Sequence, residues 1–200
     1  MPKSSKAWLR RHVTDTYVRR AKEAGYRSRA AFKLLEIDRK DRILRPGMRV
    51  LDLGAAPGGW SQVAAERVQP GGKVVAVDLL AMKPIPGVTI LTGDFRAADV
   101  AAALGGPADV VLSDMSPNVT GVPLVDQART AELILAAVDT CRKVLKPDGI
   151  FLTKIYQGSA FDDVIRELRS TFQTVGVRKP TASRSESRET YLLARGRKTH

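Results

Sequence analysis

Charged side chains stand where the predicted strands of this chain end. Asp52 lies near the end of the apolar run MRVLDL, Asp78 of KVVAVDL, Asp114 of DVVLSD and Lys154 of GIFLTKI, while Asp94 follows VTILTG. The carboxyl ends of parallel strands meet at one edge of a sheet, and ligands bind in the crevice there. A charge at one strand end is commonplace and often solvated. Five in succession predict the mouth of a binding pocket.

The loop after the first of these strands, within LDLGAAPGGW at 51–60, contains three glycines and a proline. A dinucleotide fingerprint requires G-x-G-x-x-G, whereas Ala56 stands at the second glycine position. Pro57 also removes a backbone N–H that a pyrophosphate would use. Asp78 lies 19 residues beyond Gly59, where a carboxylate accepts both hydroxyls of a ribose. These features predict an adenosine cofactor without a pyrophosphate, which describes S-adenosylmethionine.

The elements that must position these residues alternate along the chain. Strands are predicted at 48–53, 73–79, 88–93, 109–114, 149–155, 174–179 and 190–195, and helices at 29–40, 61–68, 124–145 and 161–172. Such alternation indicates an α/β fold, with a mostly parallel sheet and helices on both faces. Gly25 and Ser28 precede the first of these helices as its expected break and cap.

The length of the chain suits one α/β domain. Its 200 residues are 44% hydrophobic, which is enough for a full core and too few for two ordinary domains. The single cysteine, Cys141, excludes an intramolecular disulfide, and no apolar stretch approaches the ~18 residues that span a membrane. No histidine has a partner at ligand spacing, so no metal site is predicted. We expect a cytoplasmic monomer that requires neither a membrane nor a metal.

Positive charge is concentrated at the two ends of the chain. Residues 1–40 carry a net charge of +8 and residues 171–200 carry +5, whereas the residues between them carry −1. This segregation suits a protein that holds a polyanion beside a nearly neutral core, so nucleic acid is the predicted partner. The basic residues assigned to RNA are Lys3, Lys6, Arg10, Arg11, Arg19, Arg20, Arg27, Arg29, Arg178, Lys179, Arg184 and Arg188. The simpler alternative is a pair of solvated tails.

Several motifs in a fixed order together resemble one family. DLGAAPGGW, followed by VDLL, GDF, SDMSPN, KIYQG and SRETY, resembles the FtsJ/RrmJ/RlmE family of ribosomal RNA 2′-O-ribose methyltransferases from about Ser28 to Arg197. The resemblance implies a Rossmann-like class I methyltransferase with seven strands, the last two forming an antiparallel hairpin. It also implies methyl transfer from S-adenosylmethionine to one uridine ribose of large-subunit (23S) rRNA, within the assembled subunit. Residues 28–200 would then form a single methyltransferase domain, and residues 1–27 a basic RNA-binding extension.

The same resemblance assigns the residues of the site. Its catalytic Lys-Asp-Lys-Glu set falls on Lys33, Asp114, Lys154 and Glu189. Its cofactor contacts fall on Gly54, Pro57, Gly58, Gly59, Trp60, Asp78, Asp94 and Asp114. Trp60 has the alternative of being a plain core residue. The loop that contains Pro117 and Asn118 is expected to close over the ribose.

These side chains suit methyl transfer to a hydroxyl group. A ribose 2′-hydroxyl is a weak nucleophile at neutral pH, so the enzyme must align it and remove its proton. Lys154 is the predicted base, and burial or a neighbouring cation, expected from Lys33, is needed to lower its pKa. Asp114 is expected to orient Lys154, and Glu189 to hold Lys33 or the ribose. In an alternative role, Lys33 contacts only the target phosphate.

Two other functions fit parts of the sequence. A non-catalytic ribosome-assembly factor on a methyltransferase scaffold would explain the basic ends, but it has no need for two lysines and two acids at one pocket. A methyltransferase that acts on tRNA shares the same motifs, because surface shape selects the RNA; the compact length favours rRNA. A small-molecule methyltransferase would have no use for the segregated charge.

Overall fold

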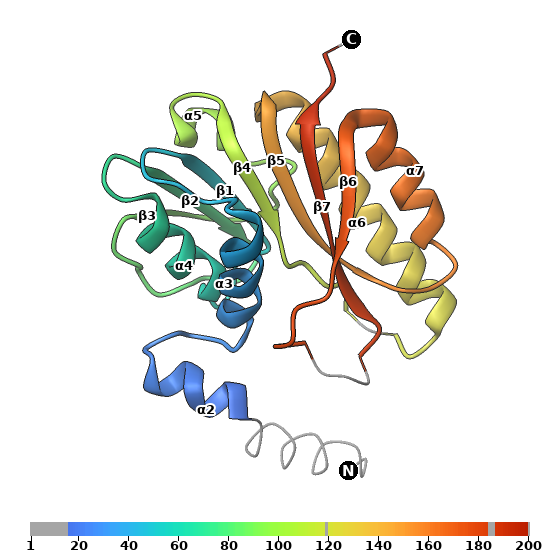
Figure 1. The fold of residues 1–200 in the computed structure, drawn as a ribbon, viewed down its shortest axis with the longest axis horizontal. Coiled ribbons are helices and arrows are strands. Elements are labelled where there is room, and N and C mark those ends of the chain that lie inside the picture. The colour runs from blue at the N-terminus through green and yellow to red at the C-terminus, as the bar shows by residue number, and fades with distance from the viewer. Residues whose placement is uncertain (1–15, 119, 184–186, 200) are drawn as a thin grey trace.

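The sheet of the protein has seven strands, and their order reverses at its centre. A computed structural model describes residues 16–118, 120–183 and 187–199. The strands are β1 (Arg49–Leu53), β2 (Lys73–Asp78), β3 (Val88–Thr92), β4 (Ala108–Ser113), β5 (Leu145–Tyr156), β6 (Phe172–Arg178) and β7 (Glu189–Arg197). Their order is β3-β2-β1-β4-β5-β7-β6 (Figure 1). The chain crosses from one half of the sheet to the other between β1 and β4, and a crevice for ligands opens at such a point.

All strand pairs are parallel except those made by β7. Leu51 of β1 pairs with Val75 of β2 on one side and with Val111 of β4 on the other. β7 runs antiparallel to both β5 and β6, with Lys154 opposite Tyr191 and Tyr156 opposite Glu189. The start of β7 therefore lies at the edge where the parallel strands end. The predicted antiparallel hairpin of the last two strands is confirmed.

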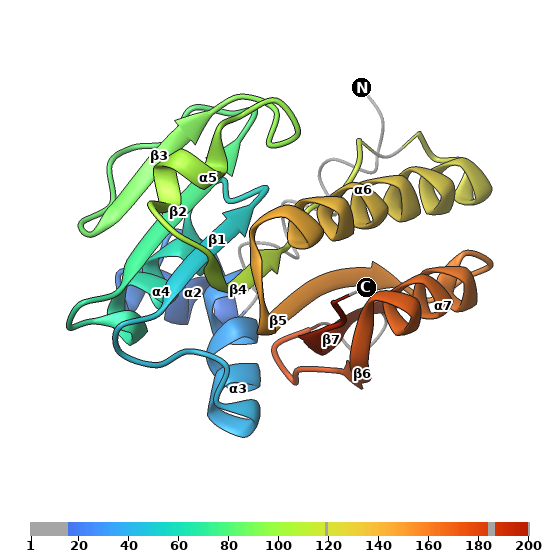
Figure 2. The ribbon, with the colours of Figure 1, turned by 90° about the horizontal axis from the view of Figure 1, so that it is seen from above.

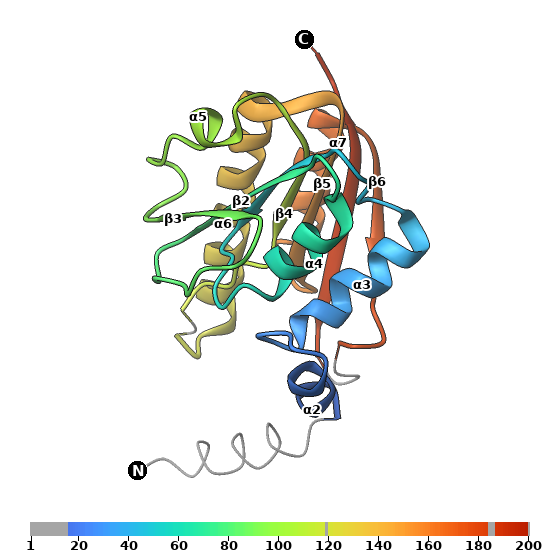
Figure 3. The ribbon, with the colours of Figure 1, turned by 90° about the vertical axis from the view of Figure 1, so that its left-hand side faces the viewer.

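Helices cover both faces of the sheet. They are α2 (Thr16–Glu23), α3 (Ala30–Asp41), α4 (Gly59–Val68), α5 (Val100–Leu104), α6 (Pro123–Val144) and α7 (Phe161–Thr171). Figures 2 and 3 show α5, α6 and α7 on one face and α3 and α4 on the other, with α2 beyond the start of α3. None of the described helices combines the length and the apolar character needed to cross a bilayer.

Alternation along the central strands produces two cores, one on each face. Leu51, Val111 and Phe151 belong to the core beneath α6 and α7. Their neighbours Val50 and Leu112 belong to the core beneath α3 and α4. Successive side chains of a strand point to opposite faces, so strands buried on both sides are apolar at every position. The predicted α/β class with a doubly covered sheet is confirmed.

The structure adds two short helices to those predicted and corrects one cap. α2 lies within the segment assigned to the basic extension, and Ala21 is the one buried residue of this helix. α5 has five residues and is capped by Asp99, whose side chain accepts a hydrogen bond from the Ala102 N–H. Gly25 has a left-handed φ of 76° directly after α2, as a break requires. Ser28 as cap of α3 is wrong, because Arg29 holds that position and no side chain caps this helix.

Candidate active site

The loop between β1 and α4 exposes backbone where side chains cannot fit. Gly54 has a φ of 68°, and a Cβ built on it would lie 2.2 Å from Met115 Cγ. Gly58 has a φ of 109°, and its Cβ would lie 2.6 Å from Ile85 Cδ1. Only glycine combines this backbone conformation with such close neighbours. The sequence motif therefore builds a narrow cradle of bare backbone, which we call the cofactor loop (residues 54–58).

Asp78 ends β2 beside the cofactor loop. Its Oδ2 accepts a hydrogen bond from the Ala56 N–H at 2.9 Å, and its Oδ1 accepts one from the Leu80 N–H at 2.8 Å. Each carboxylate oxygen has two acceptor positions, so one position on each remains for a ligand. Asp78 thus fixes the loop and retains the acceptors that a ribose diol requires.

Asp52 is a buried acid near the end of β1, just before the cofactor loop. Asp52 is 1% exposed, its Oδ2 accepts a hydrogen bond from Ser61 Oγ at 2.6 Å, and its Oδ1 has no partner among the described residues. Burial, together with the nearby charges of Asp114 and Asp78, raises the pKa of Asp52 to about 7 against the opposing hydrogen bond from Ser61. The sequence predicted Asp52 at the mouth of a pocket, but the structure buries its side chain.

Trp60 packs into the core of the face covered by α3. The ring is 2% exposed, and its Nε1–H donates a hydrogen bond to the Ala30 carbonyl oxygen at 2.8 Å. Its centroid lies 5.6 Å from that of Tyr191. These contacts account for a tryptophan at this position as a core residue, and its contact with a cofactor stays a prediction.

The four residues assigned to catalysis lie together, joined by Tyr191. Lys154 Nζ donates to the Asp114 carbonyl oxygen at 2.7 Å and lies 3.2 Å from Asp114 Oδ1. Lys33 Nζ lies 2.6 Å from Glu189 Oε1. The Tyr191 hydroxyl connects the two pairs, at 3.0 Å from Asp114 Oδ1 and 3.2 Å from Glu189 Oε1. We call these five residues the catalytic network.

Four different parts of the chain bring the catalytic network together. Lys33 comes from the buried side of α3, Asp114 directly follows β4, and Lys154 lies near the end of β5. Glu189 and Tyr191 come from the start of β7, which its antiparallel direction places at the same edge. Lys33, Lys154, Glu189 and Tyr191 are no more than 9% exposed, and the side chain of Asp114 is 19% exposed. The structure thus joins residues separated by more than 150 positions in sequence.

Burial and ion pairing oppose each other within the catalytic network. Burial lowers the pKa of Lys154, but the charges of Asp114, Tyr156 and Glu189 outweigh it and leave that pKa above its usual value. Burial alone would raise the pKa of Glu189, yet Lys33 holds it below its usual value. Lys154 is therefore an ammonium in the free protein. The expectation that Lys33 lowers the pKa of Lys154 is wrong here, because Glu189 neutralises Lys33.

Tyr191 was not predicted from the sequence. Burial and the neighbouring carboxylates raise its pKa well above the usual value, so its hydroxyl keeps its proton. A hydroxyl has one proton to donate, and two carboxylates compete for it. The sequence did contain a signal for Tyr191. Glu189 and Tyr191 are two positions apart at the start of β7, so their side chains lie on the same face.

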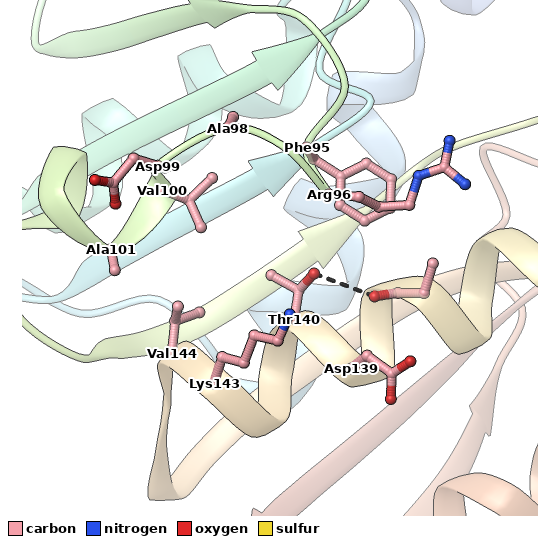
Figure 4. A pocket seen from close by; sticks show the side chains of 11 residues that line it. Phe95, Arg96, Ala98, Asp99, Val100, Ala101, Asp139, Thr140, Lys143 and Val144 are labelled. Carbon is pink, nitrogen blue, oxygen red and sulfur yellow. Dashed lines mark hydrogen bonds between the residues drawn. The ribbon is translucent and has the colours of Figure 1, made fainter.

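Asp94 follows β3 and is held by one neighbour. Its two carboxylate oxygens accept hydrogen bonds from the guanidinium of Arg96, whose Nε lies 2.9 Å from Oδ1. This ion pair lowers the pKa of Asp94. Beyond it, a cavity of about 440 Å³ lies between α5 with its preceding loop and α6 (Figure 4). Phe95 and Arg96 line that cavity, which contains no member of the catalytic network.

Arg27 holds the cofactor loop from the amino-terminal side. Its Nη1 donates to the carbonyl oxygens of Pro57 at 3.3 Å and Lys83 at 2.7 Å, and its Nη2 donates to that of Pro84 at 2.6 Å. One guanidinium thus ties the loop after β1 to the loop after β2. We call this set of contacts the Arg27 clamp. The sequence assigned Arg27 to RNA and gave no signal of this role.

Other basic residues assigned to RNA are also engaged within the protein. Arg29 donates to the Ala182 carbonyl oxygen at 2.5 Å, and Arg178 makes an ion pair with Asp41 at 2.7 Å. Lys179 donates to two backbone carbonyl oxygens near the start of β7. These cations stabilise the fold around the site. Lys3, Lys6, Arg10, Arg11 and Arg184 lie outside the described residues.

The residues around the cofactor loop fit S-adenosylmethionine. The cofactor carries ribose hydroxyls, an adenine amino group and an ammonium, and the carboxylates of Asp78, Asp94 and Asp114, which end or follow β2, β3 and β4, are acceptors for such donors. The unpartnered Oδ1 of Asp52 adds a buried acceptor below the loop. Among the described residues, no group of three or more His, Cys, Asp or Glu side chains is arranged to hold a metal ion.

Comparison with known proteins matches this arrangement to one family. The family model described as FtsJ-like methyltransferase matches residues 26–197. The chain belongs to the FtsJ-like methyltransferase family. Relatives named ribosomal RNA large subunit methyltransferase E include one from Nitrosospira multiformis, which is 52% identical and aligns over 98% of both chains. Another, from Alkalilimnicola ehrlichii, is 54% identical over 96% of this chain and 94% of its own.

Solved structures of methyltransferases share the FtsJ-like fold. A crystal structure assigned as a ribosomal RNA methyltransferase of Plasmodium falciparum superposes with a TM-score of 0.77 at 30% identity, over 86% of this chain and 98% of that one. Fibrillarin of Aeropyrum pernix, solved with S-adenosyl-L-methionine bound, superposes with a TM-score of 0.60 at 17% identity, over 84% and 75% of the two chains. The second likeness concerns the fold alone. The predicted class I methyltransferase fold is confirmed.

Proposed function

We propose that this protein transfers a methyl group from S-adenosylmethionine to the ribose 2′-oxygen of one uridine in large-subunit rRNA. The observation that carries the proposal is the catalytic network, in which two buried lysines, the buried Glu189 and the partly buried Asp114 lie at the sheet edge beside the cofactor loop. Relatives that share about half of the sequence over nearly its whole length carry the name of a large-subunit rRNA methyltransferase. A scaffold retained for binding alone has no need for these buried charges.

Lys154 is proposed as the group that takes the proton from the 2′-hydroxyl. Asp114 holds the Lys154 ammonium through its carbonyl and carboxylate oxygens, which fixes the direction of the nitrogen. The cofactor supplies a methyl group activated by a positively charged sulfur, and a positive charge lowers the pKa of a lysine beside it. The uncharged amine would then accept the 2′-proton as the oxygen bonds to the methyl carbon, and the methyl–sulfur bond would break to leave a neutral thioether.

Lys33 is proposed to stabilise negative charge on the attacking oxygen or on the adjacent phosphate. Its ion pair with Glu189 at 2.6 Å fixes the ammonium without removing its remaining donors. Ser183 also donates to Glu189 Oε1, at 3.0 Å, so the carboxylate is held from two sides. Glu189 is thus a positioning residue for Lys33. A fixed donor aimed at developing charge needs no reorganisation during the reaction.

The substrate proposed is the large ribosomal subunit with its 23S rRNA, in the cytoplasm, and the protein is proposed to act as a monomer. The amino-terminal segment, residues 1–27, is proposed as a contact for that RNA and residues 28–200 as the catalytic domain. Within the described part of this segment, the guanidinium of Arg20 lies over the rings of Tyr17 and Phe32, which packs α2 against α3. Its exposed cations, including Arg19 and Lys22, face solvent.

The test is transfer of labelled methyl from S-adenosylmethionine to large subunits, small subunits, free rRNA and tRNA. Wild type should label large subunits on a ribose 2′-oxygen, and Lys154→Ala should label nothing while its cofactor affinity stays within about tenfold, because base catalysis contributes ~10²–10⁴-fold. Lys143→Ala, an exposed lysine of α6, is the matched control. Label on tRNA would identify tRNA, instead of rRNA, as the substrate. Cofactor binding without label on any RNA would favour an assembly factor.

A further inference from the structure

A basic hollow lies at the end of the sheet opposite the catalytic network. It has a volume of about 420 Å³, and its lining residues include Arg195, Arg197, Lys198, Gln173, Thr174 and Asp148. Arg195 pairs with Ile150 and Arg197 with Phe172, near the edge where the parallel strands begin. In Figure 1 this edge is the end near C, whereas α2 lies at the other end. We call this feature the strand-start hollow.

Three cations of the strand-start hollow are fixed by backbone carbonyl oxygens. Arg195 Nη2 donates to the Asp41 carbonyl oxygen at 2.7 Å. Arg197 Nε donates to that of Leu145 at 2.8 Å, and Lys198 Nζ to that of Arg169 at 2.7 Å. A carbonyl orients a cation without cancelling its charge. These side chains therefore lose little conformational entropy when they bind an anion.

The acids around the hollow do not offset this charge. Asp148 is the single acid among the residues that line it. Asp41 is bound by Arg178 at 2.7 Å. Asp109, on the same edge, is bound by Lys146 at 2.5 Å. Three cations against one acid give the hollow an excess of positive charge, which suits an anionic ligand.

The hollow is remote from the reaction. Glu189 and Arg195 are six positions apart on one strand, and a strand rises ~3.4 Å per residue, so about 20 Å separates the catalytic edge from the hollow. A ligand that reaches both places must be long. The phosphate backbone of a folded RNA has the required length and charge, and it gains affinity at every phosphate that a cation neutralises.

We propose that the strand-start hollow binds the phosphate backbone of a second segment of the rRNA substrate. The proposal rests on the proposed function, because an rRNA substrate supplies the polyanion. Phosphate contacts of this kind set orientation and carry no sequence information. The hollow would therefore help to select folded rRNA by shape, by requiring two backbone segments about 20 Å apart.

The test compares two double variants with the same loss of charge. Lys198→Gln/Arg169→Gln removes two cations. Lys198 lines the hollow, and Arg169, near the end of α7, provides the carbonyl oxygen to which Lys198 Nζ donates. Arg129→Gln/Arg166→Gln, the control, removes two exposed cations from earlier turns of α6 and α7. The dissociation constant for large-subunit rRNA is measured at several KCl concentrations, with thermal unfolding to confirm folding. Methyl transfer is measured in parallel.

The hollow variant should bind rRNA about three- to tenfold more weakly at low salt. The slope of log affinity against log salt should fall by about 1 to 2, because each phosphate contact contributes ~0.7–0.9. The KM for rRNA should rise while kcat stays constant, and the control should keep the wild-type slope. An unchanged slope, or an equal fall in both variants, would overturn the proposal. Absence of methyl transfer by wild type would instead count against the proposed function, since the slopes report binding independently.

Inorganic phosphate provides a second arm for the experiment. A site for the RNA backbone should bind a single phosphate ion only weakly. Millimolar phosphate at constant ionic strength should therefore leave the rRNA affinity unchanged. Competition by phosphate that disappears in Lys198→Gln/Arg169→Gln would identify a small-anion site and overturn the RNA assignment.

Discussion

Lys154 is the residue whose protonation state decides between two chemical roles. The neighbouring carboxylates hold its pKa above the usual value despite burial, so the amine fraction is small at neutral pH and grows tenfold with each pH unit. If Lys154 is the base, log kcat should rise with a slope near one as the pH increases toward the pKa that Lys154 has in the cofactor complex, and should level off above that pKa. Single-turnover rates with saturating cofactor and RNA measure this. A flat profile would assign Lys154 a charged, positioning role.

Lys154→Arg separates the same two roles without a pH change. Arginine retains the positive charge but cannot give up its proton in this range. A base role predicts that Lys154→Arg is as inactive as Lys154→Ala. Substantial activity in the arginine variant would show that charge alone is needed.

The Tyr191 hydroxyl lies between the Lys154–Asp114 ion pair and the Lys33–Glu189 ion pair and contacts a carboxylate of each. Tyr191→Phe keeps the ring against Trp60 and removes the hydroxyl between Asp114 and Glu189. We expect kcat to fall about tenfold and the free energy of unfolding to fall by ~1–3 kcal/mol, as for a lost hydrogen bond to a charged group. The KM for the cofactor should not change. Tyr26→Phe, which loses a more exposed bond to Glu66, is the matched control. Equal kcat in both variants would reduce Tyr191 to a core residue.

At the scale of elements, the Arg27 clamp connects the amino-terminal segment to the cofactor loop. Arg27→Lys keeps the charge but replaces a planar fork by a single point donor, which cannot reach three carbonyl oxygens. We expect the cofactor affinity to fall about tenfold, with a higher KM for the cofactor and a smaller change in kcat. Isothermal titration calorimetry measures the affinity.

Arg19→Lys is the control for the clamp. Arg19 lies on α2 with an exposed ion pair to Glu23 at 3.7 Å, so its replacement should leave cofactor affinity unchanged. If Arg27→Lys binds the cofactor as tightly as the control, the contacts of Arg27 do not shape the site.

The strands show what an element pattern can predict. The apolar runs before Asp78 and Asp114 are strands whose carboxyl ends lie at one edge of the sheet, as predicted, because parallel strands end at the same edge. Asp52 fits this pattern equally well but is buried against Ser61. Strand position fixes the edge of the sheet on which a residue lies, whereas the packing of α4 decides whether its side chain reaches solvent.

In the whole molecule, α2, which lies in the described part of the amino-terminal segment, and the strand-start hollow are at opposite ends of the sheet (Figure 1). Deletion of residues 1–20 removes six cations, Lys3, Lys6, Arg10, Arg11, Arg19 and Arg20, and one acid, Asp15. We expect lower affinity for large-subunit rRNA and a shallower salt dependence, measured by titration at several KCl concentrations. Combined with the hollow variant, the losses should add, because distant sites act independently. An unchanged salt slope would indicate that this segment is a solvated tail without RNA contacts.

Patterns along the chain were sufficient to predict the fold class, the glycine loop after β1 and the family. Alternating apolar runs specify a doubly covered parallel sheet, and Gly54 and Gly58 of the loop are required locally by their left-handed backbone conformation. These properties depend on neighbouring residues and on the order of motifs, both of which are read along the chain.

Tertiary structure alone decided which charges meet. Arg27 is a clamp, Tyr191 joins Asp114 to Glu189, and Lys33 is neutralised by Glu189. The reversed direction of β7 brings Glu189 to the catalytic edge and carries Arg195 to the opposite one. Electrostatic interaction depends on distance through space and on burial, so residues far apart in sequence acquire their partners, and their pKa values, only when the chain is folded.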